Sequence, residues 1–472
     1  MSSLRKFGKD TFIYSFGNLF IRFISFMLVP VYTNIFSRHE FGTYSLIFTF
    51  IGFIQIIYNY GMASVLMKFY SNDPDKKSTV ITTAFISLFV TSIIFSLFLI
   101  IFATPLSSIL FSESRPDWFW YIAGILFLDT ISVRALIIIR FENRPVLFTS
   151  IALANVFVSL GANIVLVYQY QMGITGAIIA TLMASIASFL LTLHVVIKNL
   201  DFSKYSFVLF KKMMSFGLPF LPAAIFQIIM DLADRYLIDW ILGREMVGLY
   251  NAGYKIGSLM LILTTGFNLG WQPYFMTKEK DRDAPELFAR IALYVLTMFI
   301  TMWIVFILFG EYFIKFSVSG FSLIGPEFQA SAPIIPIVMS GYIFLLFYDL
   351  FMPGIFFKNQ TRLLPLYRGI GAISNIALNL IFIPKWGIAG AAWATCLSFG
   401  FMTIPLYFKS QSLFHIPYHG KKMITVIGAG ISIFAIQSYY HFDYLKGLIL
   451  FVIFIGLLGV LFFSELKNKS KL

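Results

Sequence analysis

The sequence predicts an all-α polytopic membrane protein with about fourteen transmembrane helices, and three observations lead to this fold class. Of the 472 residues, 59% are apolar and only 12% are charged, and the mean hydropathy is +0.84, far above that of an ordinary soluble domain. The apolar residues gather in runs of about 18 to 26, long enough to cross a hydrocarbon core of roughly 30 Å as helices. Alternating segments of strand length are not seen, which excludes a β-barrel.

Hydropathy, turn residues and charges place these helices in order along the chain. The predicted spans are residues 11–36, 42–67, 79–103, 118–139, 146–168, 173–197, 213–238, 247–271, 287–309, 330–352, 365–384, 388–408, 423–440 and 447–464. The basic N-terminus leads into the first span without a small-residue cleavage pattern, so we expect that span to be retained. The gaps between spans reach only about 15 to 20 residues, which favours function inside the membrane.

The distribution of lysine and arginine supports this assignment, because a missed helix would mix the basic residues between the two sides. With the N-terminus in the cytoplasm, 24 of the 35 basic residues fall in cytoplasmic segments or, for Arg290, at the cytoplasmic end of a span, and six fall in outer loops. The remaining five lie within spans: Arg22, Arg134, Arg235, Lys255 and Arg368. Much of the net charge of +13 is therefore a topology signal, and we expect no nucleic-acid partner.

An internal repeat divides the chain. Residues 173–181 and 387–395 match at six of nine positions with an offset of 214, whereas the upstream pairs 163–167 with 379–383 and 141–143 with 357–359 have an offset of 216. Ser15-Phe-Gly17 recurs as Ser215-Phe-Gly217, and Phe41-Gly-Thr-Tyr44 resembles Val247-Gly-Leu-Tyr250. A unit of six helices implies two lobes related by an axis along the membrane normal. We predict an N-lobe (1–200), a C-lobe (201–410) and a C-terminal helix pair (411–472), although glycine motifs also favour simple close packing.

Charges at bilayer depth are costly and usually face a cavity or a partner. Arg22 and Lys255 lie in the first two helices of the two halves, with no acid three or four residues away, so we predict that they line a central cavity. The alternatives are an inter-helix salt bridge for Arg22 and snorkelling for Lys255. Arg134, near the cytoplasmic end of its span, either snorkels or forms part of a basic entrance.

The acids within the spans are candidates for cation coupling, namely Asp129, Asp231 and Asp234. Asp231 and Arg235 have i,i+4 spacing, which favours an ion pair and leaves Asp234 over. Asp129 is five residues from Arg134, so the two do not share a helix face. Asp349 and Arg368 lie near the inner boundary of the membrane, so they do little to distinguish between the possible functions.

Amides at helical spacing complete the candidate substrate site, namely Gln55, Asn59, Asn268 and Gln272. Hydrogen bonds between helices are an equally good interpretation of these amides. Pro219 and Pro222 are expected to bend the seventh helix. The single cysteine, Cys396, and the isolated pair His415 and His419 predict no metal site, and no nucleotide-binding motif is present, so we expect no cofactor.

Four segments resemble the polysaccharide branch of the multidrug, oligosaccharidyl-lipid and polysaccharide exporter superfamily, and in particular O-antigen flippases. They are Ser215-Phe-Gly-Leu-Pro-Phe-Leu-Pro222, Asp234-Arg-Tyr-Leu-Ile238, Val247-Gly-Leu-Tyr-Asn-Ala-Gly-Tyr-Lys255 and the segment 379–395. With the helix count, the resemblance covers nearly the whole chain. It implies two six-helix lobes around a central cationic cavity, with basic residues on the first and eighth helices, where Arg22 and Lys255 fit by position.

The resemblance further implies a transporter, not an enzyme, that carries polyprenyl-pyrophosphate-linked oligosaccharide to the outer leaflet of a bacterial plasma membrane, with both termini cytoplasmic. Membrane lipid and polysaccharide assembly proteins are the expected partners. Arg22 and Lys255 would contact phosphate, and Trp271 and Tyr274 would stack on sugar. Two alternatives stay open, namely a cation-coupled multidrug exporter of the same superfamily and a membrane-embedded polymerase or glycosyltransferase.

Overall fold

The computed structural model describes residue 20, residue 24 and residues 26–70, 73–111, 114–279, 281–318, 320–440 and 442–469. The chain forms two compact units, unit 1 (Met1–Asn251) and unit 2 (Ala252–Leu472), and α12 (Arg244–Gly257) crosses the boundary. The lobe boundaries predicted from the repeat stay a prediction. Arg22 lies outside the described residues.

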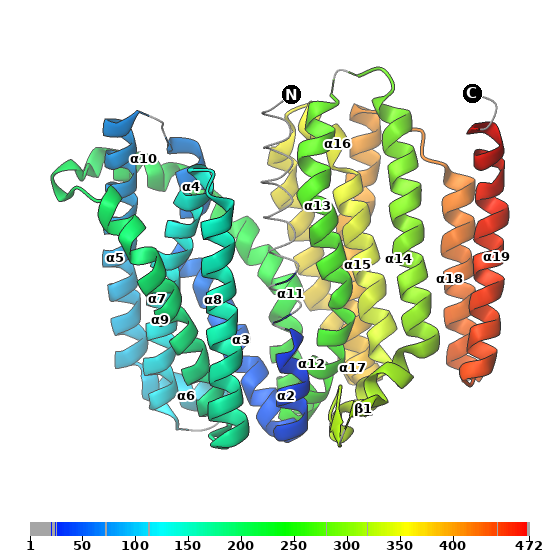
Figure 1. Cartoon of the computed structure of the whole chain (residues 1–472), viewed down its shortest axis with the longest axis horizontal. Helices are drawn as coiled ribbons and strands as arrows, with labels where there is room; N and C mark the ends of the chain where they lie inside the picture. Colours follow the sequence, from blue (N-terminus) through cyan, green and yellow to red (C-terminus); the bar gives the residue numbers. More distant parts are fainter. Residues whose placement is uncertain are drawn as a thin grey trace. The chain divides into compact units, whose positions relative to one another are not determined.

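Unit 1 is built from helices, shown in blue to green in Figure 1. Its elements are α2 (Leu28–Ile35), α3 (Arg38–Asn59), α4 (Met62–Phe69), α5 (Pro74–Ile101), α6 (Ala103–Phe111), α7 (Pro116–Phe141), α8 (Pro145–Asn163), the π-helix η1 (Ile164–Gln169), α9 (Gly173–Asn199), η2 (Phe202–Lys204), α10 (Phe207–Gly217), η3 (Leu218–Phe220) and α11 (Leu221–Leu242). Helix α7 packs against α5, α8 and α9, while α3 packs against both α7 and α11.

Unit 2 is also helical apart from one short hairpin. Its elements are α13 (Leu259–Thr277), α14 (Ala284–Lys315), β1 (Ser317–Val318), β2 (Phe321–Ser322), η4 (Pro326–Ser331), α15 (Ile334–Leu350), α16 (Met352–Phe357), η5 (Thr361–Leu363), α17 (Leu364–Leu413), α18 (Gly420–Tyr440) and α19 (Tyr444–Lys469). The two strands pair antiparallel, with Ser317 opposite Ser322. Helices α14, α18 and α19 lie side by side (Figure 1).

Eleven helices of the described chain are long and apolar enough to cross a membrane, or twelve if the bent pair α12 and α13 forms one span. The prediction of fourteen spans is therefore supported in part. The first predicted span lies mostly outside the described residues, and the spans 365–384 and 388–408 fall within α17, which is broken at Gly387. A continuous helix over 247–271 was wrong, because a 41° bend separates α12 from α13.

Local chemistry explains where several helices begin and break. Ser37 and Glu40 form a capping box at the start of α3, and Pro116 and Pro145 occupy the first turns of α7 and α8, where a missing N–H costs nothing. In the predicted seventh helix, the 3₁₀ turn η3, which contains Pro219, separates α10 from α11, whereas the expected bend stays a prediction.

The repeat motifs adopt equivalent local geometry in the two units. Gly173 and Gly387 are both left-handed, with φ of 59° and 58°. A Cβ on Gly176 would lie 3.2 Å from the carbonyl oxygen of Leu166, and one on Gly390 would lie 2.2 Å from that of Phe382. Close packing is therefore the local role of these glycines.

The matched motifs Phe41-Gly-Thr-Tyr44 and Val247-Gly-Leu-Tyr250 are in direct contact within unit 1. A Cβ on Gly42 in α3 would lie 2.1 Å from the carbonyl oxygen of Arg244, and one on Gly248 in α12 would lie 2.0 Å from that of Arg38. The contact is reciprocal: each glycine meets the carbonyl group of the residue that lies four positions before the other glycine. No side chain fits at either position, which makes this helix crossing dependent on glycine.

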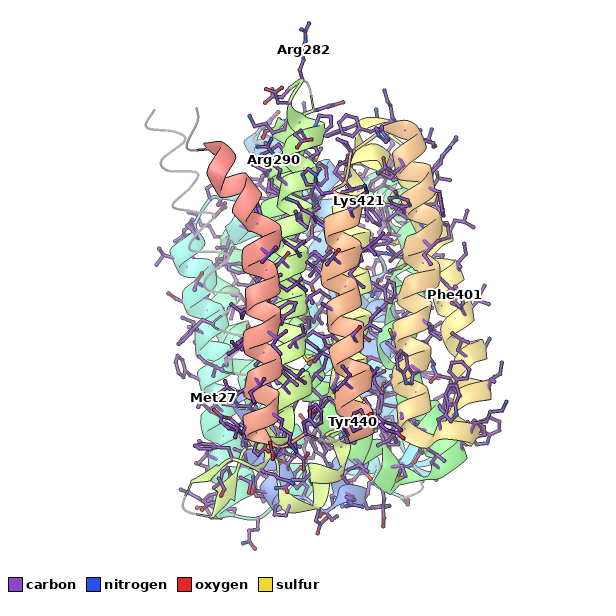
Figure 2. The ribbon with its side chains drawn as sticks, turned by 90° about the vertical axis from the view of Figure 1, so that its right-hand side faces the viewer. Met27, Arg282, Arg290, Phe401, Lys421 and Tyr440 are labelled. Carbon is purple, nitrogen blue, oxygen red and sulfur yellow. The ribbon has the colours of Figure 1, made fainter. Side chains whose placement is uncertain are left out.

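Three basic side chains of unit 2 lie at one end of its helices. Figure 2 shows Arg282, Arg290 and Lys421 at the same end, and Tyr440 at the opposite end of α18. Arg282 and Arg290 belong to the turn between α13 and α14 and to the start of α14, whereas Lys421 starts α18. The arrangement agrees with the assignment of both loops to one side of the membrane.

Candidate functional site

A buried arginine links α7 to α3 in unit 1. Arg134 is only 4% exposed, and its Nη2 donates a hydrogen bond to Oδ1 of Asn59. Its Nε–H is also buried and has no hydrogen-bond partner among the described residues, and none of their carboxylates forms an ion pair with it. Snorkelling is therefore wrong for Arg134, although Arg140, at the end of the same helix, is exposed.

The surroundings of Arg134 make this burial costly. Its neighbours Ile131, Ala135 and Ile138 on α7 belong to a buried apolar cluster that also includes Tyr60 at the end of α3. Burying a guanidinium without a counter-charge is unfavourable, because the low dielectric neither solvates nor neutralises it. Such residues in membrane proteins commonly face a substrate or an ion pathway.

Polar groups on α3 extend from this arginine. Gln55 lies one turn before Asn59, and both side chains are half-buried. Because residues four apart share a helix face, the two amides form a short polar strip that leads away from Arg134 along α3. The sequence predicted this pair, but not that Asn59 contacts Arg134, since the residues are 75 positions apart.

Asp129 lies about one and a half turns before Arg134 on α7, facing a different helix. Its half-buried carboxylate lies near Ser185 of α9. The prediction that Asp129 and Arg134 do not share a face is confirmed, since they contact α9 and α3, respectively.

The acids of α11 form two separate arrangements. Both carboxylate oxygens of Asp231 accept hydrogen bonds from Nε2 of Gln227, at 3.1 and 3.0 Å. Asp234 is fully buried, with one oxygen 2.6 Å from Nη1 of Arg235 and the other accepting a 2.5 Å bond from the Tyr250 hydroxyl. The Arg235 guanidinium also lies 5.7 Å from the centre of the Tyr250 ring.

The prediction that Asp234 is left over was wrong. Arg235 turns back to the carboxylate of its neighbour and donates to the backbone carbonyl of Asp231, at 2.6 Å, rather than leaving Asp234 without a counter-charge. Helix spacing did not show that Tyr250, from α12, completes the arrangement. The feature of the sequence that could have indicated a role for Tyr250 was its position in the repeated motif Val247-Gly-Leu-Tyr250.

The other candidate residues belong to unit 2. Lys255 is exposed on α12, while Asn268 is half-buried and Gln272 is exposed on α13. Trp271 is 3% exposed, and its indole N–H donates to the carbonyl of Asp349 at 3.0 Å, so the expectation that it stacks on sugar was wrong. Tyr274 is 38% exposed. The pairing of Arg22 with Lys255 in one cavity stays a prediction.

Comparison with known proteins identifies the sequence family. The model of a family described as "Polysaccharide biosynthesis protein" matches residues 7–277, which is more than half of the chain. An uncharacterized membrane protein of Methanocaldococcus jannaschii is 36% identical over 114 residues, covering 23% of this chain and 22% of the relative's length.

Solved structures share the fold of the whole chain. The lipid II flippase MurJ in an inward closed conformation has a TM-score of 0.77 at 16% identity, covering 96% of this chain and 99% of the other. An inward-facing multidrug resistance MATE family transporter of the MOP superfamily has a TM-score of 0.65 at 13% identity, with 89% and 96% covered. At these identities the likeness establishes the fold.

Proposed function

We propose that this chain, which belongs to the polysaccharide biosynthesis protein family and is a membrane transporter with the MOP superfamily fold, moves a polyprenyl-pyrophosphate-linked oligosaccharide such as an O-antigen unit across a bacterial plasma membrane. Transport would run from the cytoplasmic to the outer leaflet by alternating access, with both termini cytoplasmic. The observation that carries the proposal is the burial of Arg134 without a carboxylate partner among the described residues.

The chemistry of Arg134 suits a phosphate. A guanidinium offers five N–H donors in a planar fork that matches phosphate oxygens, and its hydrogen bonds to anions are stronger than neutral ones. One donor group is used by Asn59, while the buried Nε–H has no partner among the residues that the structure describes. A phosphate oxygen at Nε would satisfy that donor and supply the missing negative charge.

The neighbouring amides suit the sugar next to the phosphate. Gln55 and Asn59 each carry a donor and an acceptor group, as sugar hydroxyls do, so they exchange hydrogen bonds with a glycan at little net cost. Arg22 in the proposed N-lobe (1–200) and Lys255, Asn268 and Gln272 in the proposed C-lobe (201–410) are the further candidates for substrate contacts. The C-terminal helix pair (411–472) is the third proposed domain.

The membrane potential favours export of an anionic headgroup. A negative charge that leaves an inside-negative cytoplasm gains roughly 2.3 kcal/mol per 100 mV. Coupling to an inward cation would add to this, with Asp129, Asp231 and Asp234 as the candidate sites. Polysaccharide assembly proteins would take up the glycan on the outer side.

The test compares two arginines of the same helix. Arg134→Ala and Arg134→Lys are reconstituted in vesicles with a fluorescent lipid-linked oligosaccharide, and translocation is followed by quenching from outside. We expect at least about a hundredfold slower translocation for the alanine variant and partial activity for lysine, which retains the charge but not the fork. The matched control, Arg140→Ala, removes an exposed arginine and should translocate normally.

Unchanged translocation by both Arg134 variants, at wild-type protein levels, would remove this arginine from the mechanism. The same vesicles also test the alternative function. A cation-coupled multidrug exporter would expel a preloaded organic cation dye when an inward proton or sodium gradient is imposed, and Asp231→Asn would slow that efflux.

A further inference from the structure

A polar pocket lies in unit 1, at the other end of α3 from Arg134. Its volume is about 390 Å³, within the range of small-molecule sites. It is lined by Asn34, Ile35, Phe36, Glu40, Tyr168, Gln171 and Gly173. Glu40 and Asn59 are 19 positions apart on α3, which corresponds to about 28 Å along the helix. The pocket is thus distinct from the site of Arg134.

An insertion in the first repeat forms one wall of this pocket. Asn163 and Gly173 are ten positions apart, whereas their counterparts Asn379 and Gly387 are eight apart. The additional residues are accommodated by the π-helix η1, a rare form found frequently at functional sites, and by Gln171, which is left-handed with φ of 51°. The second repeat continues there as α17 up to the break at Gly387.

Neighbouring contacts hold the wall in place. The Tyr32 hydroxyl of α2 donates a 2.7 Å hydrogen bond to Oδ1 of the buried Asn163, at the base of the π-helix. The Met172 amide donates to the carbonyl of Leu166 at 2.9 Å, which closes the turn after η1. The inserted residues therefore occupy a defined position and present Tyr168 and Gln171 to the pocket.

The residues that line the pocket favour some classes of ligand over others. Calcium requires six to eight oxygen ligands, and the pocket offers one carboxylate, of which Oε2 already accepts bonds from the amide and hydroxyl of Ser37 at 2.9 Å. A lipid chain suits instead the separate pocket of about 270 Å³ between α5, α7 and α9, whose lining side chains are all apolar. A carboxylate also repels phosphate.

From this lining we propose that the pocket is a carbohydrate subsite, which holds a neutral or amino sugar of the transported glycan and disfavours acidic sugars. Tyr168, which is 56% exposed, offers a ring face, while Asn34, Gln171 and Glu40 offer amide and carboxylate groups for hydroxyls. The assignment of the ligand rests on the proposed function. The pocket lies at the end of α3 that the sequence places outside, where it would receive the sugar after Arg134 has released the phosphate.

The experiment measures sugar binding without transport. Saturation-transfer NMR is recorded on the full chain in nanodiscs with D-glucose, D-glucosamine and D-glucuronate as probes. We expect saturation of glucose and glucosamine, and at least about tenfold weaker binding of glucuronate. Tyr168→Ala should weaken glucose binding about tenfold, whereas the control Tyr170→Ala, which removes a 71% exposed ring outside the lining, should not change it.

Glu40→Gln isolates the carboxylate, because glutamine also fits a capping box and preserves the start of α3. This variant should bind glucuronate and glucose with similar affinity. Absence of saturation for every sugar in the wild type, or an equal signal in Tyr168→Ala, would overturn the carbohydrate subsite.

The same samples distinguish the two proposals. Arg134→Ala should keep the sugar signal while translocation is lost, because the residues are far apart along α3. A retained sugar signal with normal translocation by Arg134→Ala contradicts only the proposed phosphate site. A missing sugar signal with lost translocation contradicts only the subsite.

Discussion

Two arginines of unit 1 are equally buried and differ in what neutralises them. Arg235 is 3% exposed and contacts the carboxylate of Asp234, which also binds the Tyr250 hydroxyl. Arg134 is 4% exposed, and its described partner is the neutral amide of Asn59. Burial of an arginine alone therefore does not identify a substrate site. A neutralised charge holds helices together, whereas an uncompensated one is ready for a ligand.

The largest expected effect breaks the neutralised arrangement. Asp234→Asn removes the carboxylate that contacts the buried Arg235 and should lower the free energy of unfolding by about 3–5 kcal/mol. Unfolding in mixed SDS micelles measures this change. The double variant Asp234→Leu with Arg235→Leu removes both charges and should recover most of the loss. If the double variant is no more stable than Asp234→Asn, the pair is not the origin of the effect.

A smaller effect comes from the helix that brings Tyr250 to Asp234. Gly248→Ala places a Cβ 2.0 Å from the Arg38 carbonyl oxygen, so α12 must shift, at a cost of about 1–3 kcal/mol in the same unfolding assay. Gly428→Ala in α18 is the matched control, because no atom lies within 4 Å of the position that its Cβ would take. Equal stability of the two variants would contradict a tight crossing between α3 and α12.

The smallest expected change in stability is that of a variant of Arg134. Arg134→Met should leave the free energy of unfolding within about 1 kcal/mol of the wild type, or raise it, because it removes a buried charge that has no carboxylate partner among the described residues. Arg235→Met, by contrast, should lower it by about 3–5 kcal/mol, because the buried carboxylate of Asp234 then keeps the Tyr250 hydroxyl but loses the guanidinium. A similar loss in both variants would mean that Arg134 is neutralised after all.

Sequence patterns predicted the candidate site unevenly. Helical spacing correctly grouped Gln55 with Asn59 and separated Asp129 from Arg134, because both relations depend on one helix. Helical spacing failed for Asp234, whose partner Tyr250 comes from another helix, and the expectation that Trp271 stacks on sugar overlooked its contact with Asp349. The pocket beside the π-helix was overlooked, although the change of offset from 216 to 214 already recorded the insertion in the first repeat.

The sequence by itself determined that the solvent is a membrane, where most of the spanning helices lie and where Pro219 and Gly387 interrupt helices, and it predicted which loops share a side. These properties depend on hydropathy, loop charge and backbone conformation, which are local along the chain. Only the tertiary structure decided that Arg235 is neutralised and that Arg134 has no carboxylate partner among the described residues. The choice of partner depends on which helices become neighbours, and no periodicity within one helix records the side chains of another.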